Sequence, residues 1–244
     1  MQRLSLSLPI YNTSMGKLQQ MARWAEEARF ETAWDYEFFR SPFMTLGVAA
    51  LATNRIKLGT GIAVALSRSP MVTANEAADV DELSQGRMVL GIGAGAGEFL
   101  QAWHNTDLTN AVPRMREYIE AMRVVWGSVG SGKPASYTGT HYNLRLGGVR
   151  RPLVREQIPV YLAGVQPKVI QLAGEIADGQ LGFFYSPRYL KEVVYPNLAI
   201  GARRGGREAA AVDICSFIIC SVAKDRREAL RRARIQVGYY AVGS

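Results

Sequence analysis

The spacing of hydrophobic positions along the chain follows two periods, one typical of strands and one typical of helices, and the two alternate from segment to segment. Short apolar runs and every-second-position patterns predict strands, whereas apolar residues three and four positions apart predict helices. Strands are expected at 3–8, 31–36, 55–64, 87–93, 158–164, 180–185 and 213–222. Helices are expected after them, at 14–29, 42–52, 70–83, 112–126, 167–177, 187–202 and 224–236. The pattern therefore predicts seven strand–helix units in series.

Strands that alternate with helices usually pair in parallel through right-handed crossovers. Seven such units favour an α/β fold of the TIM (β/α)8 barrel type over an open doubly wound sheet. The eighth βα unit is lacking or truncated in this pattern, which ends at YYAVGS. We therefore expect residues 1–244 to form a single barrel domain. An irregular insertion rich in Gly, Ser, Pro and Arg is expected at about 127–157.

Composition narrows the class of protein. Of the 244 residues, 48% are hydrophobic and 20% are charged, which supports a sizeable core and argues against disorder. No apolar stretch reaches the length of a membrane helix, and the N-terminus lacks the apolar region of a signal peptide. The expectation is a soluble, cytoplasmic protein that does not bind membranes.

The formal net charge is +8, from 29 Lys and Arg against 21 Asp and Glu. Such a balance favours anionic partners, which include nucleic acids and phosphorylated cofactors. The basic residues at 226–234 are interpreted as a solvated helix face, because no nucleic-acid-binding motif accompanies them. With only two histidines and two cysteines, the chain is expected to hold no metal and to bind no nucleic acid.

Two features mark candidate ligand contacts. The run 91–96 has the letters G-x-G-x-x-A of the dinucleotide fingerprint, but it ends the fourth strand, whereas the fingerprint ends the first. Small residues at the carboxyl end of a barrel strand instead let a flat ligand approach the backbone. Lys168 stands near the start of the helix at 167–177, where its charge and the helix N–H groups favour a cofactor phosphate.

Asp35 and Glu37 are candidate functional carboxylates. They stand at the end of the strand at 31–36, beside the aromatic residues Trp34 and Tyr36. A carboxylate among aromatic side chains at a barrel mouth is a functional candidate, because burial there shifts its pKa. A carboxylate that only binds the following loop is an equally open interpretation.

Several segments together resemble the bacterial luciferase-like monooxygenase superfamily. The resemblance lies in residues 56–62, 67–70, 77–87 and 90–95. Residues 159–164 and 167–179 resemble its coenzyme F420-dependent branch, which includes methylenetetrahydromethanopterin reductases. Each segment alone is weak, but the combination is specific and covers most of residues 1–223.

The resemblance implies a luciferase-like TIM barrel, often a homodimer, that binds F420 or FMN without covalent attachment. It implies a non-prolyl cis peptide behind the cofactor ring, which matches the Gly61–Ile62 bond here. Together with Lys168, the expected cofactor-binding residues are Gly61, Ile62, Gly93, Ala94, Gly95, Ala163, Gly164 and Val165.

The expected proton-transfer residues depart from the family pattern. The second strand of the family often ends in Asp-His, which here reads Asp35-Tyr36. A family glutamate after the glycines of the fourth strand aligns with Ala96, and Glu98 lies two residues further on. Asp35, Tyr36 and Glu98 are therefore the catalytic candidates. The departures argue against the sugar-phosphate reaction of the glucose-6-phosphate dehydrogenase members.

The resemblance implies an oxidoreductase that transfers a hydride between F420 and an unidentified small organic substrate. F420 carries a phosphodiester and an acidic tail, which suits a chain of charge +8. An FMN-dependent luciferase-like monooxygenase is the first alternative. A non-catalytic truncated barrel, and a barrel lyase or isomerase that acts on a phosphorylated substrate, are further alternatives.

Overall fold

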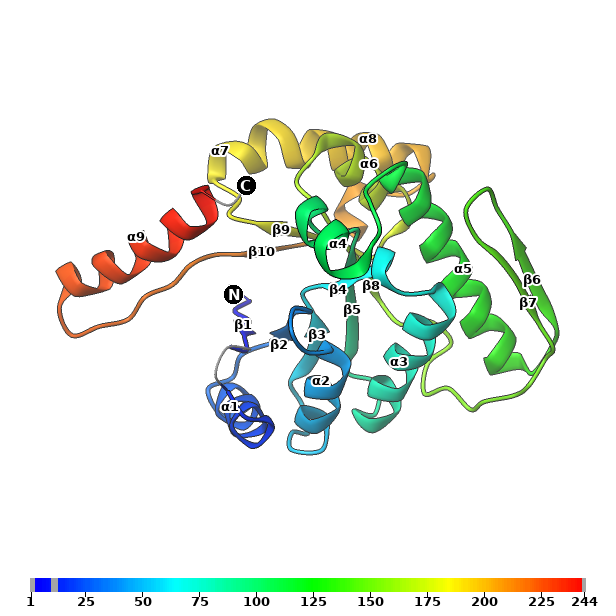
Figure 1. Cartoon of the computed structure of the whole chain (residues 1–244), viewed down its shortest axis with the longest axis horizontal. Helices are drawn as coiled ribbons and strands as arrows, with labels where there is room; N and C mark the ends of the chain where they lie inside the picture. Colours follow the sequence, from blue (N-terminus) through cyan, green and yellow to red (C-terminus); the bar gives the residue numbers. More distant parts are fainter. Residues whose placement is uncertain (1–2, 10–12, 243–244) are drawn as a thin grey trace.

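The computed structural model describes residues 3–9 and 13–242. Its main sheet contains β1 (Leu6–Ser7), β2 (Thr32–Asp35), β3 (Lys57–Thr60), β4 (Ala63–Val64), β5 (Met88–Gly93), β8 (Val160–Ala163), β9 (Gly179–Phe183) and β10 (Asp213–Phe217). All neighbouring strands are parallel, in the order β1-β2-β3-β5-β8-β9-β10, and β4 also pairs with β5. The sheet curves into a nearly closed TIM barrel with helices around it (Figure 1).

The helices of the described residues follow the strands. They are α1 (Met15–Glu27), α2 (Pro42–Ala50), α3 (Pro70–Leu83), α4 (Gly97–His104), α5 (Ala111–Ser131), α6 (Pro167–Ile176), α7 (Pro187–Tyr189), α8 (Tyr195–Arg204) and α9 (Arg226–Val242). A π-helical turn, Leu190–Val194, joins α7 to α8. None of these helices is both long enough and apolar enough to cross a lipid bilayer.

Capping explains where two of the helices begin. The Ser14 hydroxyl accepts a hydrogen bond from the Lys17 N–H at 3.3 Å, and Ser69 accepts one from Val72 at 3.2 Å. Pro70 follows Ser69 as the first residue of α3, where its missing N–H costs no helix hydrogen bond. These signals are readable in the sequence, and the predicted helices at 14–29 and 70–83 are confirmed as α1 and α3.

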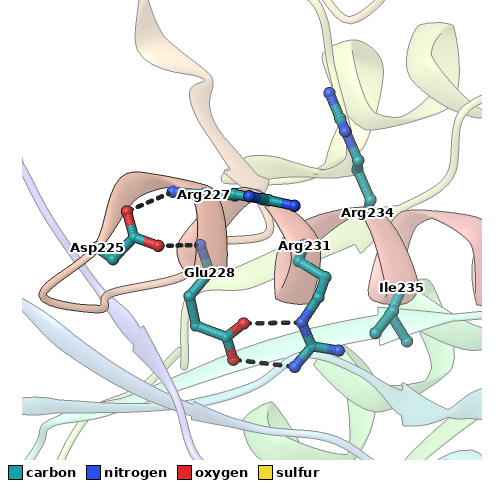
Figure 2. Close-up of a pocket in the computed structure, with 6 residues that line it drawn as sticks. All are labelled: Asp225, Arg227, Glu228, Arg231, Arg234 and Ile235. Atoms are coloured by element: carbon teal, nitrogen blue, oxygen red, sulfur yellow. Dashed lines mark hydrogen bonds and ion pairs between the residues drawn. The ribbon is translucent and has the colours of Figure 1, made fainter.

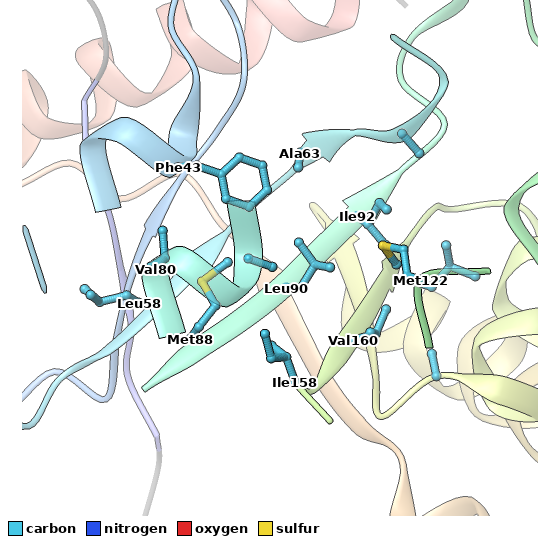
Figure 3. Close-up of a cluster of buried hydrophobic side chains, with 14 of the residues drawn as sticks. Phe43, Leu58, Ala63, Val80, Met88, Leu90, Ile92, Met122, Ile158 and Val160 are labelled. Carbon is cyan, nitrogen blue, oxygen red and sulfur yellow. The ribbon is translucent and has the colours of Figure 1, made fainter. Parts of the chain in front are cut away.

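The core has two layers, one on each face of the sheet. Met88, Leu90 and Ile92 of β5 project outward among side chains of α2, α3 and α5 (Figure 3). Successive residues of a strand face opposite sides, so the other face of β5 points into the barrel. There Val89 packs in a second cluster with Trp34 of β2 and Leu181 of β9, and other inward-facing side chains join it.

The barrel has an open side between β1 and β10. No strand of the described residues pairs with both, although the Arg3 guanidinium forms ion pairs with Asp213 at the start of β10 and with Glu31 before β2. A long extended segment leads from β10 to α9, which stands away from the barrel (Figure 1). Each of the seven predicted strand positions contains a strand of the main sheet, and the position at 55–64 contains two, β3 and β4.

The structure differs from the predicted elements in three places. The strand expected at 55–64 is divided into β3 and β4, and helix α4 occupies residues that were expected to be loop. The segment 127–157 is not wholly irregular. Helix α5 continues to Ser131, and β6 (Ala135–Thr138) and β7 (Asn143–Leu146) form an antiparallel hairpin.

These differences have local physical causes. Gly127 and Gly130 are weak helix formers, so the sequence pattern did not predict the last turns of α5. The helix ends where Gly132 adopts a φ of +70°. The alternation of Leu144 and Leu146 with polar residues is a strand pattern, and these two side chains pack against the main core.

Candidate cofactor and substrate cavity

A cavity of about 1280 Å³ lies where the parallel strands end. In a barrel of this type, the loops after the strands converge at the carboxyl face and carry the site. Each of the eight strands of the main sheet contributes to the lining through its last residue or the loop after it. Examples are Tyr36, Gly61, Gly93, Ala163, Phe183 and Phe217. The fold therefore gathers residues from the whole length of the chain around one opening.

The first wall of the cavity is the segment between β3 and β4. Its Gly61–Ile62 peptide bond is cis, as the resemblance implies. The Gly61 N–H donates to the Asp35 carbonyl at 2.6 Å, and the Glu37 N–H donates to the Ile62 carbonyl at 2.9 Å. This segment is therefore hydrogen-bonded on both sides of the bond to the chain that leaves β2.

The second wall is formed by the end of β5, where Gly93 and Gly95 present backbone atoms to the cavity because they have no side chains. A Cβ atom on Gly93 would lie 2.7 Å from Ile62 Cδ1 and 3.2 Å from Ala163 Cβ. Gly95 adopts a φ of +97°, a backbone conformation that residues other than glycine rarely adopt. Glycine at position 93 thus lets Ile62 and Ala163 pack closely against the backbone of β5, and a side chain there would displace them.

The third wall follows β8 and is fixed from behind by buried polar groups. Gln180 is fully buried, and its Nε2 donates to the Gly164 carbonyl at 2.7 Å. The Tyr185 hydroxyl donates to the same carbonyl at 2.9 Å, and the Tyr189 hydroxyl donates to the Val165 carbonyl. No short sequence motif marks this support, so the sequence alone does not predict it.

Lys168 adds positive charge at the end of this wall. It lies in the first turn of α6, whose preceding residue Gln166 makes no side-chain cap. The helix N-terminus and the ammonium group together favour an anion here. All nine residues expected to bind the cofactor line this one cavity.

The three catalytic candidates do not converge. Tyr36 lines the cavity. Asp35 is only 1% exposed and lies on the opposite face of β2, toward Thr45 of α2. Glu98 is exposed on α4, outside the residues that line the cavity.

Burial dominates the electrostatics of Asp35. Loss of solvent around the carboxyl group raises its pKa to about 6, although the Thr45 hydroxyl and the Tyr36 N–H lower it in part. The carboxylate makes no hydrogen bond of regular geometry among the described residues. Asp35 is therefore a buried carboxyl group behind the sheet, and Tyr36 is the neighbour that reaches the cavity.

Glu37, the second candidate carboxylate at the end of β2, does line the cavity. Glu37 Oε2 accepts the Val64 N–H at 2.8 Å, and its Oε1 accepts from Arg68 at 2.6 Å. Arg68 also pairs with Glu76 of α3. The segment 67–70, noted only for the family resemblance, thus contains the arginine that anchors Glu37 and, through Val64, the start of β4.

Comparison with known proteins agrees with this geometry. The family model described as luciferase-like monooxygenase matches residues 5–242. The chain belongs to the luciferase-like monooxygenase family. It is 31% identical over 230 residues to 5,10-methylenetetrahydromethanopterin reductase of Methanolobus tindarius, covering 93% of this chain and 68% of that protein. It is 33% identical over 232 residues to the reductase of the same name from Archaeoglobus fulgidus, covering 93% and 67%.

A solved member of this family supports the fold directly. The structure of the coenzyme F420-dependent tetrahydromethanopterin reductase from Methanopyrus kandleri superposes with a TM-score of 0.84 and 26% identity. The match covers 99% of this chain and 72% of that one. The luciferase-like TIM barrel predicted from the sequence is therefore confirmed, in a chain shorter than its relatives.

A second hollow on this luciferase-like chain has a different character. It lies on α9 and is lined by Asp225, Arg227, Glu228, Arg231, Arg234 and Ile235 (Figure 2). Glu228 accepts two hydrogen bonds from Arg231, at 2.7 and 2.9 Å, and Asp225 accepts the N–H groups of Arg227 and Glu228. Glu228 and Arg231 thus form an ion pair on one exposed helix, which fits the solvated face that the sequence predicts.

Proposed function

We propose that this protein is an oxidoreductase that binds coenzyme F420 and transfers a hydride between it and a small organic substrate. The observation that carries the proposal is the cavity at the carboxyl ends of the strands, one surface of which is formed by Ile62, Gly93 and Ala163 packed closely together. A surface of backbone and small apolar groups suits a flat ring system. The name of the solved coenzyme F420-dependent reductase supports F420 as the occupant.

The residues present fit this cofactor. Backbone and small side chains at Gly61, Gly93 and Ala163 offer flat apolar surface for the ring. At the edge of the same cavity, Lys168 and the start of α6 offer positive charge for a phosphodiester. The formal net charge of +8 favours a polyanionic ligand over the whole molecule.

When bound, F420 supplies a hydride donor or acceptor at C5 of its deazaflavin ring. The segment Gly61–Ile62 and the loop at 163–165 orient the ring and limit its movement. Apolar lining excludes water and thereby strengthens the electrostatic interactions inside. The Tyr36 hydroxyl holds or moves a proton at the substrate, because it is the one catalytic candidate placed at the cavity.

The test is a fluorescence titration of the protein with oxidised F420, followed by competition with FMN. We expect saturable quenching that an excess of about a hundredfold FMN does not reverse. Reversal by FMN would move the protein to the flavin-dependent monooxygenases of the family. Failure of both cofactors to bind would contradict the oxidoreductase proposal and leave a non-catalytic relative.

The Tyr36→Phe variant belongs in the same titration. It removes only the hydroxyl, so the affinity for F420 should stay within about twofold of the wild-type value. A large loss of affinity would assign Tyr36 to cofactor binding in place of proton transfer.

A further inference from the structure

Four aromatic rings gather on the α4 side of the cavity. Phe38, from the loop after β2, lies 5.8 Å from Phe99 and 4.7 Å from Trp103, measured between ring centroids. Phe99 and Trp103 are 4.7 Å apart on consecutive turns of α4. Phe39 adds a fourth ring, 4.3 Å from Phe38 and 5.3 Å from Trp103. Phe38, Phe99 and Trp103 form the part of the cluster that lines the cavity, and we call these three the ring subsite.

The ring subsite keeps much of its apolar surface in contact with solvent. Phe99 is 44% exposed and Trp103 is 42% exposed, although both have close aromatic neighbours. Covering exposed aromatic surface is favourable, and ring edges and faces add preferred contacts with a second aromatic group. The rings belong to the same cavity as Gly61 and Gly93, so a molecule placed on them lies next to the proposed cofactor space.

Charge limits what this molecule can be. Tyrosines aside, the ionisable side chains that line the described cavity are Glu37, His104 and Lys168. Both oxygens of Glu37 already bind Val64 and Arg68. Lys168 stands on α6, after β8, whereas the ring subsite comes from the chain after β2 and β5. No lysine or arginine of the described lining stands beside the rings to pair with a phosphate or carboxylate group.

We propose that the ring subsite binds the substrate, and that the substrate is an uncharged molecule with an aromatic or similarly flat apolar ring. The proposal deepens the proposed function and rests on it, because it places the substrate beside the F420 space. Burial of an unpaired charge against these rings is unfavourable, so the subsite selects neutral compounds. His104, the last residue of α4, offers a polar group at the rim for a hydroxyl or carbonyl of such a molecule.

The test uses two probes that differ in charge, 2-naphthol and 2-naphthoate, in isothermal titrations of the full chain. We expect 2-naphthol to bind at least about fivefold more tightly than 2-naphthoate at pH 7. Trp103→Ala should weaken 2-naphthol binding by about fivefold or more, and Trp103→Phe should restore most of it. Trp24→Ala is the matched control, because Trp24 is an exposed tryptophan on α1 that does not line the cavity.

The outcomes separate the subsite from the proposed function, because F420 is titrated into every variant. Stronger binding of 2-naphthoate, absence of 2-naphthol binding, or equal binding by wild type and Trp103→Ala would overturn the subsite. If Trp103→Ala instead changes the sedimentation coefficient, the rings are an interface between copies and the proposal fails. Loss of F420 binding by the wild type would overturn the proposed function, whatever the probes do.

Discussion

At the scale of single residues, the alternation of β2 decides which side chains reach the cavity. Trp34 points into the barrel, with its ring centroid 6.0 Å from that of Tyr161 and 5.9 Å from that of Phe217. Its neighbour Asp35 points to the opposite face, where burial raises its pKa to about 6. Tyr36 then returns to the cavity side. An acid group can thus adjoin a site in sequence and still be separated from it by the sheet.

The buried Asp35 predicts a pH dependence of stability. Its pKa of about 6 in the folded protein lies above its ordinary value of 3.8, so the folded state holds the proton more strongly. This contribution to the free energy of unfolding is fully present below about pH 4, falls as the pH rises toward about 6, and stays low above that. Asp35→Asn should remove this fall and stabilise the protein at about pH 8 by about 3 kcal/mol.

Urea unfolding of wild type and Asp35→Asn at about pH 4.5 and pH 8 measures this difference. Glu208→Gln is the control, because Glu208 is exposed and the same charge is removed without burial. An equal loss of stability between the two pH values in wild type and Asp35→Asn would contradict the account.

Individual site residues were predictable to different degrees. The nine cofactor positions follow from small residues at strand ends and from the family resemblance, and all line the cavity. The catalytic set was predictable only in part, because sequence adjacency to an aromatic residue does not tell which face a side chain takes. Gln180 could not be found at all, since its role depends on a buried hydrogen bond to Gly164, a residue distant in the chain.

At the scale of elements, the hairpin β6–β7 shows how one side chain orders a turn. Glu117 of α5 accepts the backbone N–H groups of Thr140, His141 and Tyr142, at 3.0, 2.7 and 3.1 Å. The turn between the two strands is thereby bound to the helix before it. The sequence predicted an irregular segment here, because Gly and Pro are typical of loops and the two strands between them are short.

Removal of this carboxylate should loosen the hairpin alone. In Glu117→Ala, three N–H groups of the turn lose their acceptor, so hydrogen exchange at 139–143 should accelerate by about tenfold or more. Glu156→Ala, which removes an exposed carboxylate in the segment after β7, should leave that exchange unchanged. Hydrogen-exchange mass spectrometry makes the comparison. Slow exchange in Glu117→Ala would show that the strands hold the turn without the helix.

Element prediction succeeded where caps and periodicity agree. The order of strands and helices, and the bounds of α3, were predictable from Pro70, Ser69 and the apolar period. Helix α4 was missed because the glycines before it dominate the local pattern, although Phe99, Leu100 and Trp103 have helical spacing. This helix bears on function, because α4 carries two of the three rings of the ring subsite.

At the scale of the whole molecule, the parallel strands at seven barrel positions bring the loops after them together around one cavity. The barrel itself stays open between β1 and β10. The ion pair between Arg3 and Asp213 links the two outer strands at their starts. At the other end, Tyr240 of α9 contacts Phe183 and Phe184 at the edge of the cavity, with ring centroids 4.8 and 5.4 Å apart. The barrel type could be predicted by counting units. The course of α9 could not, because its packing depends on few contacts.

The central claim is that F420 lies in the cavity against the surface formed by Ile62, Gly93 and Ala163. Titration of F420 into wild type, Gly93→Val and Gly127→Ala tests it most directly. Gly127 lies in α5 with open space around the position of a Cβ atom, so its substitution is the matched control. Melting temperatures of all three proteins show whether each is folded.

We predict that Gly127→Ala binds F420 like the wild type. A folded Gly93→Val protein should bind it at least about tenfold more weakly, because the added side chain collides with Ile62 and Ala163 and changes the surface that they form with β5. Wild-type affinity in folded Gly93→Val would show that the cofactor lies elsewhere and would contradict the account.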